Sequence, residues 1–182
     1  LSGVPASAAP SILQKSYTIT AEIEIPEGGA EGMIVTQGGR FGGYGLFLSK
    51  GELGIRRGKP VFLYNLLDLK RTVWDGPELP PGKHTIEVVF TPESPKPGSP
   101  ANVTMSIDGT QVAKGRIDEQ VPMRCGTETM DVGMDCVSPV CADYEKKGLF
   151  PFTGTIESIT FAFGAHAKPS GMERLKMATR MD

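Results

Sequence analysis

Three carboxylates stand close together near the start of the sequence, at Glu22, Glu24 and Glu27. Paired carboxylates can supply the nucleophile and the general acid of glycoside hydrolysis. In a β-strand Glu22 and Glu24 would share a face, but Pro26 ends that strand before Glu27. The single tryptophan, Trp74, also supplies little aromatic surface for a cleft that binds sugar. A jelly-roll glycoside hydrolase is therefore a remote alternative, and an outward polar row on a solvent-facing strand is the preferred interpretation.

Oxygen ligands suited to a hard cation gather later in the chain, at Asp131, Asp135 and Asp143, with Ser138 between them. This spacing would allow a calcium ion to bind at the rim of a sandwich. Aspartates that cap turns explain the same residues without a metal. The sequence leaves both interpretations open, and it predicts no other cofactor.

The three cysteines, Cys125, Cys136 and Cys141, are odd in number and fit no C-x-x-C metal spacing. If the chain is exported, one pair could be oxidised, and Cys136 and Cys141 are the nearest in sequence. Free, partly buried thiols explain the same residues equally well. Both redox states stay open at this point.

Length and composition predict one domain. The 182 residues are 39% hydrophobic, enough for a core without a metal or disulfide framework. The net charge of −2 is spread along the chain and offers no basic field for nucleic acid and no polybasic membrane patch. No apolar run approaches the roughly 20 residues that cross a bilayer. The sequence begins with Leu1 and not with Met, which suggests a piece of a longer protein.

Alternation of apolar and polar residues predicts many short strands and no βαβ unit. The expected fold is an all-β, antiparallel two-sheet jelly-roll β-sandwich over residues 16–165. Residues 1–15 are expected to form a linker, and residues 166–182 a tail with a short helix at 171–181. Asp108-Gly109 is a strong hairpin signal. The expected strands are 17–25, 33–36, 44–49, 61–66, 70–74, 84–90, 102–107, 111–117 and a last one within 149–163.

Two of these strands, 44–49 and 61–66, are apolar on both faces, which favours central positions joined as a hairpin. We expect four apolar side chains to be buried between the sheets. They are Phe47, Leu63, Val88 and Ile107.

Four glycines enclose Arg40 and Phe41, as Gly38-Gly39 and Gly42-Gly43. Such a bracket indicates either positive φ at a bend or close approach of the backbone to another surface. A glycine-rich bend between strands is the favoured interpretation. A loop that presents Arg40 and Phe41 to a partner is the alternative.

Several sequence blocks occur in an order that resembles a known family. MSIDGTQVAKGRI resembles a hairpin of concanavalin A-like and laminin-G-like sandwiches. The blocks TITAEIEIPEGGAEG, VTQGGRFGGYGLFL, KPVFLYNLL, LPPGKHTIEVVF, DVGMDCVSPVCADY and FTGTIESITF follow one another over residues 16–163. This series is similar to the non-catalytic C-terminal domain of large bacterial-type arylsulfatases. The longer loop GELGIRRGK and the cysteines Cys136 and Cys141 depart from the family pattern.

The resemblance implies an accessory domain that docks in cis on a sulfatase catalytic domain, with an extracytoplasmic location favoured. The chain itself is expected not to be an enzyme. Sulfatases make their nucleophile from the Cys or Ser of C/S-x-P-x-R, and the nearest match, 120–124, begins with Gln120. The expected partner-binding residues are Arg40 and Phe41, with Arg56 and Arg57 at the rim. The alternative function is a lectin-like carbohydrate-binding module with a glycan as partner.

Overall fold

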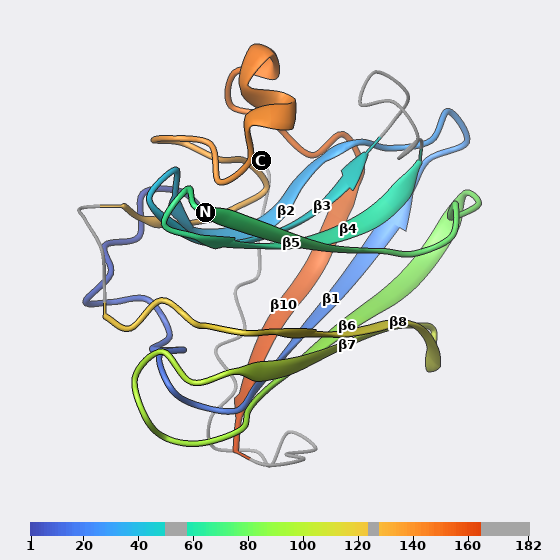
Figure 1. The fold of residues 1–182 in the computed structure, drawn as a ribbon. Coiled ribbons are helices and arrows are strands. Elements are labelled where there is room, and N and C mark those ends of the chain that lie inside the picture. The colour runs from blue at the N-terminus through green and yellow to red at the C-terminus, as the bar shows by residue number, and fades with distance from the viewer. Residues whose placement is uncertain (50–57, 124–127, 165–182) are drawn as a thin grey trace.

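Two antiparallel sheets of five strands each form the body of the protein (Figure 1). A computed structural model describes residues 1–49, 58–123 and 128–164. The first sheet contains β1 (Tyr17–Ile25), β6 (Gly82–Pro92), β7 (Ala101–Ile107), β8 (Thr110–Ile117) and β10 (Thr155–Phe163), in the order β10-β1-β6-β7-β8. The second contains β2 (Gly32–Gly39), β3 (Gly42–Ser49), β4 (Lys59–Leu66), β5 (Lys70–Asp75) and β9 (Met130–Val132), in the order β5-β4-β3-β2-β9. The all-β sandwich expected from the sequence is confirmed.

The strands form where the sequence alternates. In β1 every second side chain is buried from Tyr17 to Ile25, and the strand stops at Pro26, which has no backbone N–H to donate. The β7–β8 hairpin turns at Asp108 and Gly109, whose φ angles of 49° and 79° suit a two-residue turn. Alternation and turn residues thus locate these strands, as expected from the sequence.

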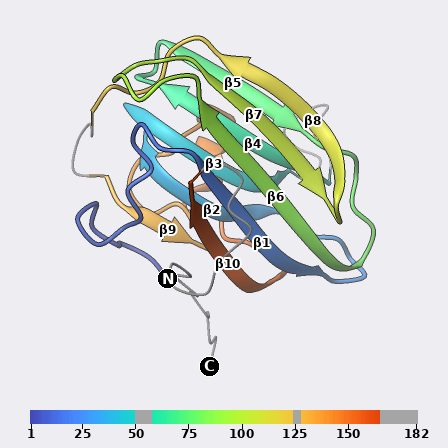
Figure 2. The ribbon, with the colours of Figure 1, turned by 90° about the horizontal axis from the view of Figure 1, so that it is seen from below.

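The main core fills the space between the sheets. Its aromatic centre stacks Tyr17 of β1 on Phe90 of β6, with ring centroids 4.8 Å apart. At one side the sheets meet closely, since β5 lies beside β8 (Figure 2) and a Cβ on Gly115 would come within 2.4 Å of the Trp74 indole nitrogen. Trp74 is buried there, so its ring packs in the core and is not available for a ligand.

A second core lies on the outer face of the second sheet. Phe47 of β3 and Leu63 of β4 belong to this cluster. Tyr144 and Phe150 join it from residues 133–152, which cross the sheet and which we call the covering segment. The expectation that Phe47 and Leu63 lie between the sheets is therefore wrong, although both are fully buried; Val88 and Ile107 are buried in the first sheet as expected. Both faces of β3 and β4 are apolar, so alternation alone could not say which face points inward.

Two short elements in this part of the chain were not revealed by alternation. These are the three-residue strand β9 at the edge of the second sheet and the 3₁₀ helix η1 (Ala142–Lys147) of the covering segment. Tyr144 of η1 is buried against Phe47, with ring centroids 5.5 Å apart. Elements this short carry too few residues to show a period. The expected helix at 171–181 lies outside the described residues.

The N-terminal segment runs along the sandwich. Val4 pairs with Met130, the N–H of Gly3 donates to Asp131, and the amide of Gln14 donates to the carbonyl of Pro122. Backbone and side-chain hydrogen bonds thus attach residues 1–14 to the sandwich. The sequence of this segment has no periodicity, so these contacts could not be predicted from it.

Among the described residues, no helix has both the length and the apolar character needed to cross a bilayer.

Candidate functional site: the Arg40 pocket

The glycine bracket is a tight hairpin turn between β2 and β3. Gly38 pairs with Gly43 and Gly39 with Gly42, which leaves Arg40 and Phe41 at the tip. Gly38, Gly42 and Gly43 have φ angles of 96°, 131° and 144°, which L side chains rarely adopt. The bend interpretation is confirmed.

This turn also lies close to another part of the chain. A Cβ on Gly39 would come within 2.4 Å of the Ser138 hydroxyl oxygen, and the backbone N–H of Arg40 donates to the same hydroxyl at 2.9 Å. The close approach is thus made to residue 138 of this domain. The glycines are explained without a partner, while the side chains at the tip remain available.

Asn65, which carries no local sequence signal, holds the turn in place by hydrogen bonds. It is fully buried at the end of β4, and its amide nitrogen donates to the carbonyls of Gly39 and Arg40 at 3.0 and 2.8 Å. Its amide oxygen accepts the N–H of Asp68 at 3.0 Å. One side chain therefore ties the β2–β3 turn to the β4–β5 turn.

The two turns and η1 enclose a polar pocket of about 220 Å³, which we call the Arg40 pocket. Its lining residues are Arg40, Asp68, Arg71, Pro139, Ala142 and Glu145. Asp68 lies between the guanidinium groups: it accepts from Nε of Arg40 at 3.2 Å and also pairs with Arg71. The Arg40 side chain remains 60% exposed, so this ion pair leaves donors facing solvent.

The charges of the Arg40 pocket balance, with two guanidinium groups against two carboxylates. Guanidinium groups only donate hydrogen bonds and carboxylates only accept them. A ligand that matches both must donate and accept at neighbouring positions, as hydroxyl groups do. The pocket is therefore chemically suited to a polyhydroxylated ligand more than to a phosphate.

Of the four expected partner-binding residues, two lie at the tip of the β2–β3 turn, and one of these lines the pocket. Arg40 lines the pocket, and Phe41 beside it is 63% exposed, an exposed aromatic in the part of the chain that the structure describes. Arg56 and Arg57 lie outside the described residues. The other charged members, Asp68, Arg71 and Glu145, were missed because they come together only when separate turns meet.

The expected calcium ligands do not converge. Asp131 is buried and accepts from Gly3 N–H and Thr129 Oγ1, while Asp143 is exposed on η1. Asp135 accepts from the backbone N–H of Val140. Within residues 1–49, 58–123 and 128–164, no group of three or more His, Cys, Asp or Glu side chains could hold a metal. The calcium site remains a sequence-based prediction without support from this geometry.

Asp135 instead anchors η1. Its carboxylate accepts the Tyr144 hydroxyl at 2.5 Å, and burial raises the pKa of the carboxyl above its ordinary value. A carboxyl whose pKa is higher in the folded state favours folding most when it is protonated. Stability from this group is therefore lost as the pH rises from the unfolded pKa of about 3.9 through the raised folded pKa.

We expect Asp135→Asn to become more stable relative to wild type as the pH rises from 3.5 to 7, because asparagine cannot ionise. Urea unfolding at several pH values measures the difference. The control is Asp143→Asn, which makes the same replacement at an exposed carboxyl of η1. A constant difference between Asp135→Asn and wild type across this range would show that Asp135 does not titrate with folding.

Cys136 and Cys141 are free thiols in the structure, and Cys125 lies outside the described residues. Cys141 is buried at the start of η1, where its sulfur accepts the N–H of Asp143 at 3.4 Å. Burial raises the pKa of the Cys141 thiol to about 11. This cysteine is thus a protonated cap of η1 at neutral pH, far from the thiolate form that reacts.

The carboxylates of β1 do not form a catalytic pair in a cleft. Glu22 accepts a hydrogen bond from the Ser158 hydroxyl at 2.5 Å, and Glu24 and Glu27 are exposed. Glu22 and Glu24 share the outer face of the first sheet, as the alternation predicts. Neither contributes to the lining of the Arg40 pocket.

No protein-family model matches the sequence, and no curated protein matches it. Among solved structures, the sandwich is similar to the CBM40 module of the Ruminococcus gnavus IT-sialidase bound to alpha2,3 sialyllactose. The TM-score is 0.54 and the identity 12%, over 84% of this chain and 78% of that chain. The same module bound to alpha2,6 sialyllactose gives a TM-score of 0.53 and 11% identity, over 84% and 79%.

A native heptameric SAP-like pentraxin from Limulus polyphemus is matched at a TM-score of 0.46 and 11% identity, over 81% of this chain and 63% of that chain, too distant to bear on function. At such identities the CBM40 similarity establishes the fold alone. The chain thus has the jelly-roll β-sandwich fold.

Proposed function

We propose that this chain is a lectin-like carbohydrate-binding module that holds sugar hydroxyl groups in the Arg40 pocket. The observation that carries the proposal is the balanced set of donors and acceptors from Arg40, Arg71, Asp68 and Glu145 around one cavity. Vicinal hydroxyls of a sugar can donate to a carboxylate and accept from a guanidinium fork at the same time. Phe41, the neighbour of Arg40 at the tip of the turn, offers an exposed apolar ring.

The comparison supports this proposal at the level of architecture. The CBM40 module in the solved complexes is bound to sialyllactose, so a sandwich of this layout can present a glycan site. Identity of 12% does not carry the ligand across. The zero net charge of the Arg40 pocket favours a neutral saccharide unit over an acidic one.

We further propose that the chain binds its ligand without hydrolysing it. Glu22 is engaged with Ser158 on an open sheet face, and Gln120 occupies the position where a sulfatase nucleophile precursor would stand. Gln120 is buried and its amide donates to the Ser99 carbonyl at 2.7 Å, which is a structural use of this side chain.

A second candidate function is docking on the catalytic domain of a sulfatase within a longer protein. The observation that favours it is a set of exposed apolar side chains on turns that meet near Arg40: Phe41 at 63%, Leu69 at 83% and Val137 at 60% exposure. Aromatic residues and arginine are enriched where interfaces concentrate their energy, and Phe41 and Arg40 are of these types. This candidate and the glycan site use the same end of the sandwich.

A glycan array followed by calorimetry on the best ligand tests the first proposal. We expect Arg40→Ala to weaken binding at least tenfold, since it removes a donor fork that is 60% exposed and able to reach a ligand. Arg116→Ala is the matched control, because Arg116 is also ion-paired, to Glu93 and Asp118, but does not line the pocket. Arg71→Lys should weaken binding as well, because a lysine lacks the planar fork.

Equal binding by Arg40→Ala and wild type would place the ligand elsewhere. Failure of the whole array, combined with loss of stability in a longer parent protein carrying Arg40→Ala and Phe41→Ala, would favour docking instead. Turnover of an aryl sulfate or a β-glucan by the purified chain would contradict the binding role.

A further inference from the structure

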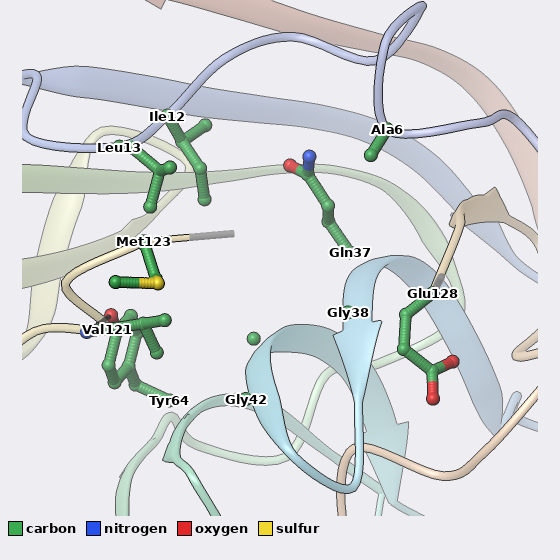
Figure 3. Close-up of a pocket in the computed structure, with 11 residues that line it drawn as sticks. Ala6, Ile12, Leu13, Gln37, Gly38, Gly42, Tyr64, Val121, Met123 and Glu128 are labelled. Atoms are coloured by element: carbon green, nitrogen blue, oxygen red, sulfur yellow. Dashed lines mark hydrogen bonds between the residues drawn. The ribbon is translucent and has the colours of Figure 1, made fainter. Parts of the chain in front are cut away.

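The glycine-rich turn also borders a second cavity, which we call the Tyr64 pocket (Figure 3). It lies between the turn, the N-terminal segment, Tyr64 of β4 and the non-strand segment that follows β8. Its side chains come from four separate parts of the chain. Those used below are Ile12, Leu13, Gln37, Tyr64, Met123 and Glu128.

The walls of the Tyr64 pocket are mainly apolar. Ile12 and Leu13 face Met123 and Tyr64 across the open space (Figure 3). The cavity measures about 80 Å³, roughly half of a 150 Å³ apolar cavity that binds benzene. A short, linear aliphatic group with fewer heavy atoms than benzene suits this volume.

The polar atoms that lack partners in this pocket are acceptors. Oε1 of Gln37 is buried without a hydrogen-bond partner. The Nε2 atom of the same amide faces the carbonyl of Pro10 at 3.4 Å. Exchanging the nitrogen and oxygen of the Gln37 amide would place its oxygen against the carbonyl oxygen of Pro10. Oε1 is therefore the atom left for a ligand.

Glu128 supplies the negative charge of the lining. Its Oε1 accepts the Ser138 hydroxyl at 2.7 Å, while Oε2 is buried and has no partner among the described residues. No lysine or arginine lines this cavity among the described residues. A buried acceptor without a donor is costly, and a carboxylate oxygen more so, which favours a ligand that brings N–H groups and positive charge.

We propose that the Tyr64 pocket binds a primary alkylammonium group, the chemistry of a lysine side chain or of a free aliphatic amine. The aliphatic stem lies against Ile12, Leu13 and Met123. Gln37 Oε1 accepts an N–H of the ammonium group, and the Glu128 carboxylate attracts its charge from farther along the cavity (Figure 3). Long cationic side chains commonly bury their methylenes in this way. This site does not depend on glycan binding in the Arg40 pocket.

The test uses the whole chain with methyl-labelled methionine, in an amine-free buffer at constant ionic strength. The probes are n-butylammonium, n-butanol and butyrate, each titrated into the millimolar range. We expect a saturable shift of the Met123 methyl resonance with n-butylammonium, at least tenfold weaker binding of n-butanol, and no binding of butyrate. Nα-acetyl-lysine amide distinguishes the sources: if it binds as well as n-butylammonium, a peptide lysine fits, and if it does not, the site takes a free amine.

Two isosteric variants test the role of charge. Glu128→Gln should weaken n-butylammonium binding at least tenfold, while Glu119→Gln, an exposed residue outside the pocket, should leave it within twofold of wild type. Equal binding of n-butanol or butyrate, an unaffected Glu128→Gln variant, or no saturable shift of Met123 would overturn the proposal. Arg40→Ala should retain amine binding, so a failed glycan experiment would not be mistaken for failure of this one.

Discussion

Replacing Phe47 by alanine is expected to lower the free energy of unfolding by about 3–5 kcal/mol. Phe47 is fully buried, and its ring makes edge contacts with Tyr144 and Phe150 at centroid distances of 5.5 and 5.9 Å. Those two rings hold the covering segment to the outer face of the second sheet. The substitution thus opens a cavity under η1 and removes its main apolar contact.

Urea unfolding measures this loss, and Phe41→Ala provides the control. Phe41 is 63% exposed, so its truncation should change stability by no more than about 0.5 kcal/mol. Limited proteolysis gives a second readout, because residues 133–152 should be cut faster in Phe47→Ala than in wild type. A loss below about 1 kcal/mol, with no change in proteolysis, would mean that the covering segment holds to the sheet by other contacts.

The second large effect is expected at Asn65. Asn65→Ala leaves the carbonyls of Gly39 and Arg40 and the N–H of Asp68 without their partner. One buried polar group left unpaired costs about 1–3 kcal/mol, so we expect a total loss of about 3 kcal/mol. The two turns that carry Arg40 and Asp68 would also separate, and any glycan bound in the Arg40 pocket should bind more weakly.

Asn102→Ala is the matched control, because Asn102 is exposed on β7. It should leave both stability and glycan binding close to wild type. Thermal unfolding and calorimetry on both variants measure the two effects. Unchanged glycan affinity in a destabilised Asn65→Ala protein would show that the turns keep their positions without this amide.

The position of the strands could be predicted from local sequence for a simple reason. A half-buried strand alternates, and Tyr17 to Ile25 alternates without exception until Pro26. Asp108-Gly109 likewise defines its hairpin, because both residues adopt positive φ there. These signals lie within a few neighbouring residues and need no tertiary contact.

The candidate site could be predicted only in part. Arg40 and Phe41 stand out because four glycines surround them, a local feature. Asp68, Arg71 and Glu145 carry no comparable signal, since the first two belong to the β4–β5 hairpin and the third to η1. Their convergence is a property of the packed turns.

The sequence by itself determined the strand segments, the jelly-roll class and the hairpin that carries Arg40, because those depend on alternation and turn chemistry. Only the tertiary structure decided which face of β3 and β4 is covered by residues 133–152, and hence where Phe47 and Leu63 are buried. It also decided that a polar pocket and an apolar one border the same turn. The buried face and the two pockets depend on contacts between residues far apart in sequence. Such contacts form only when the whole core assembles.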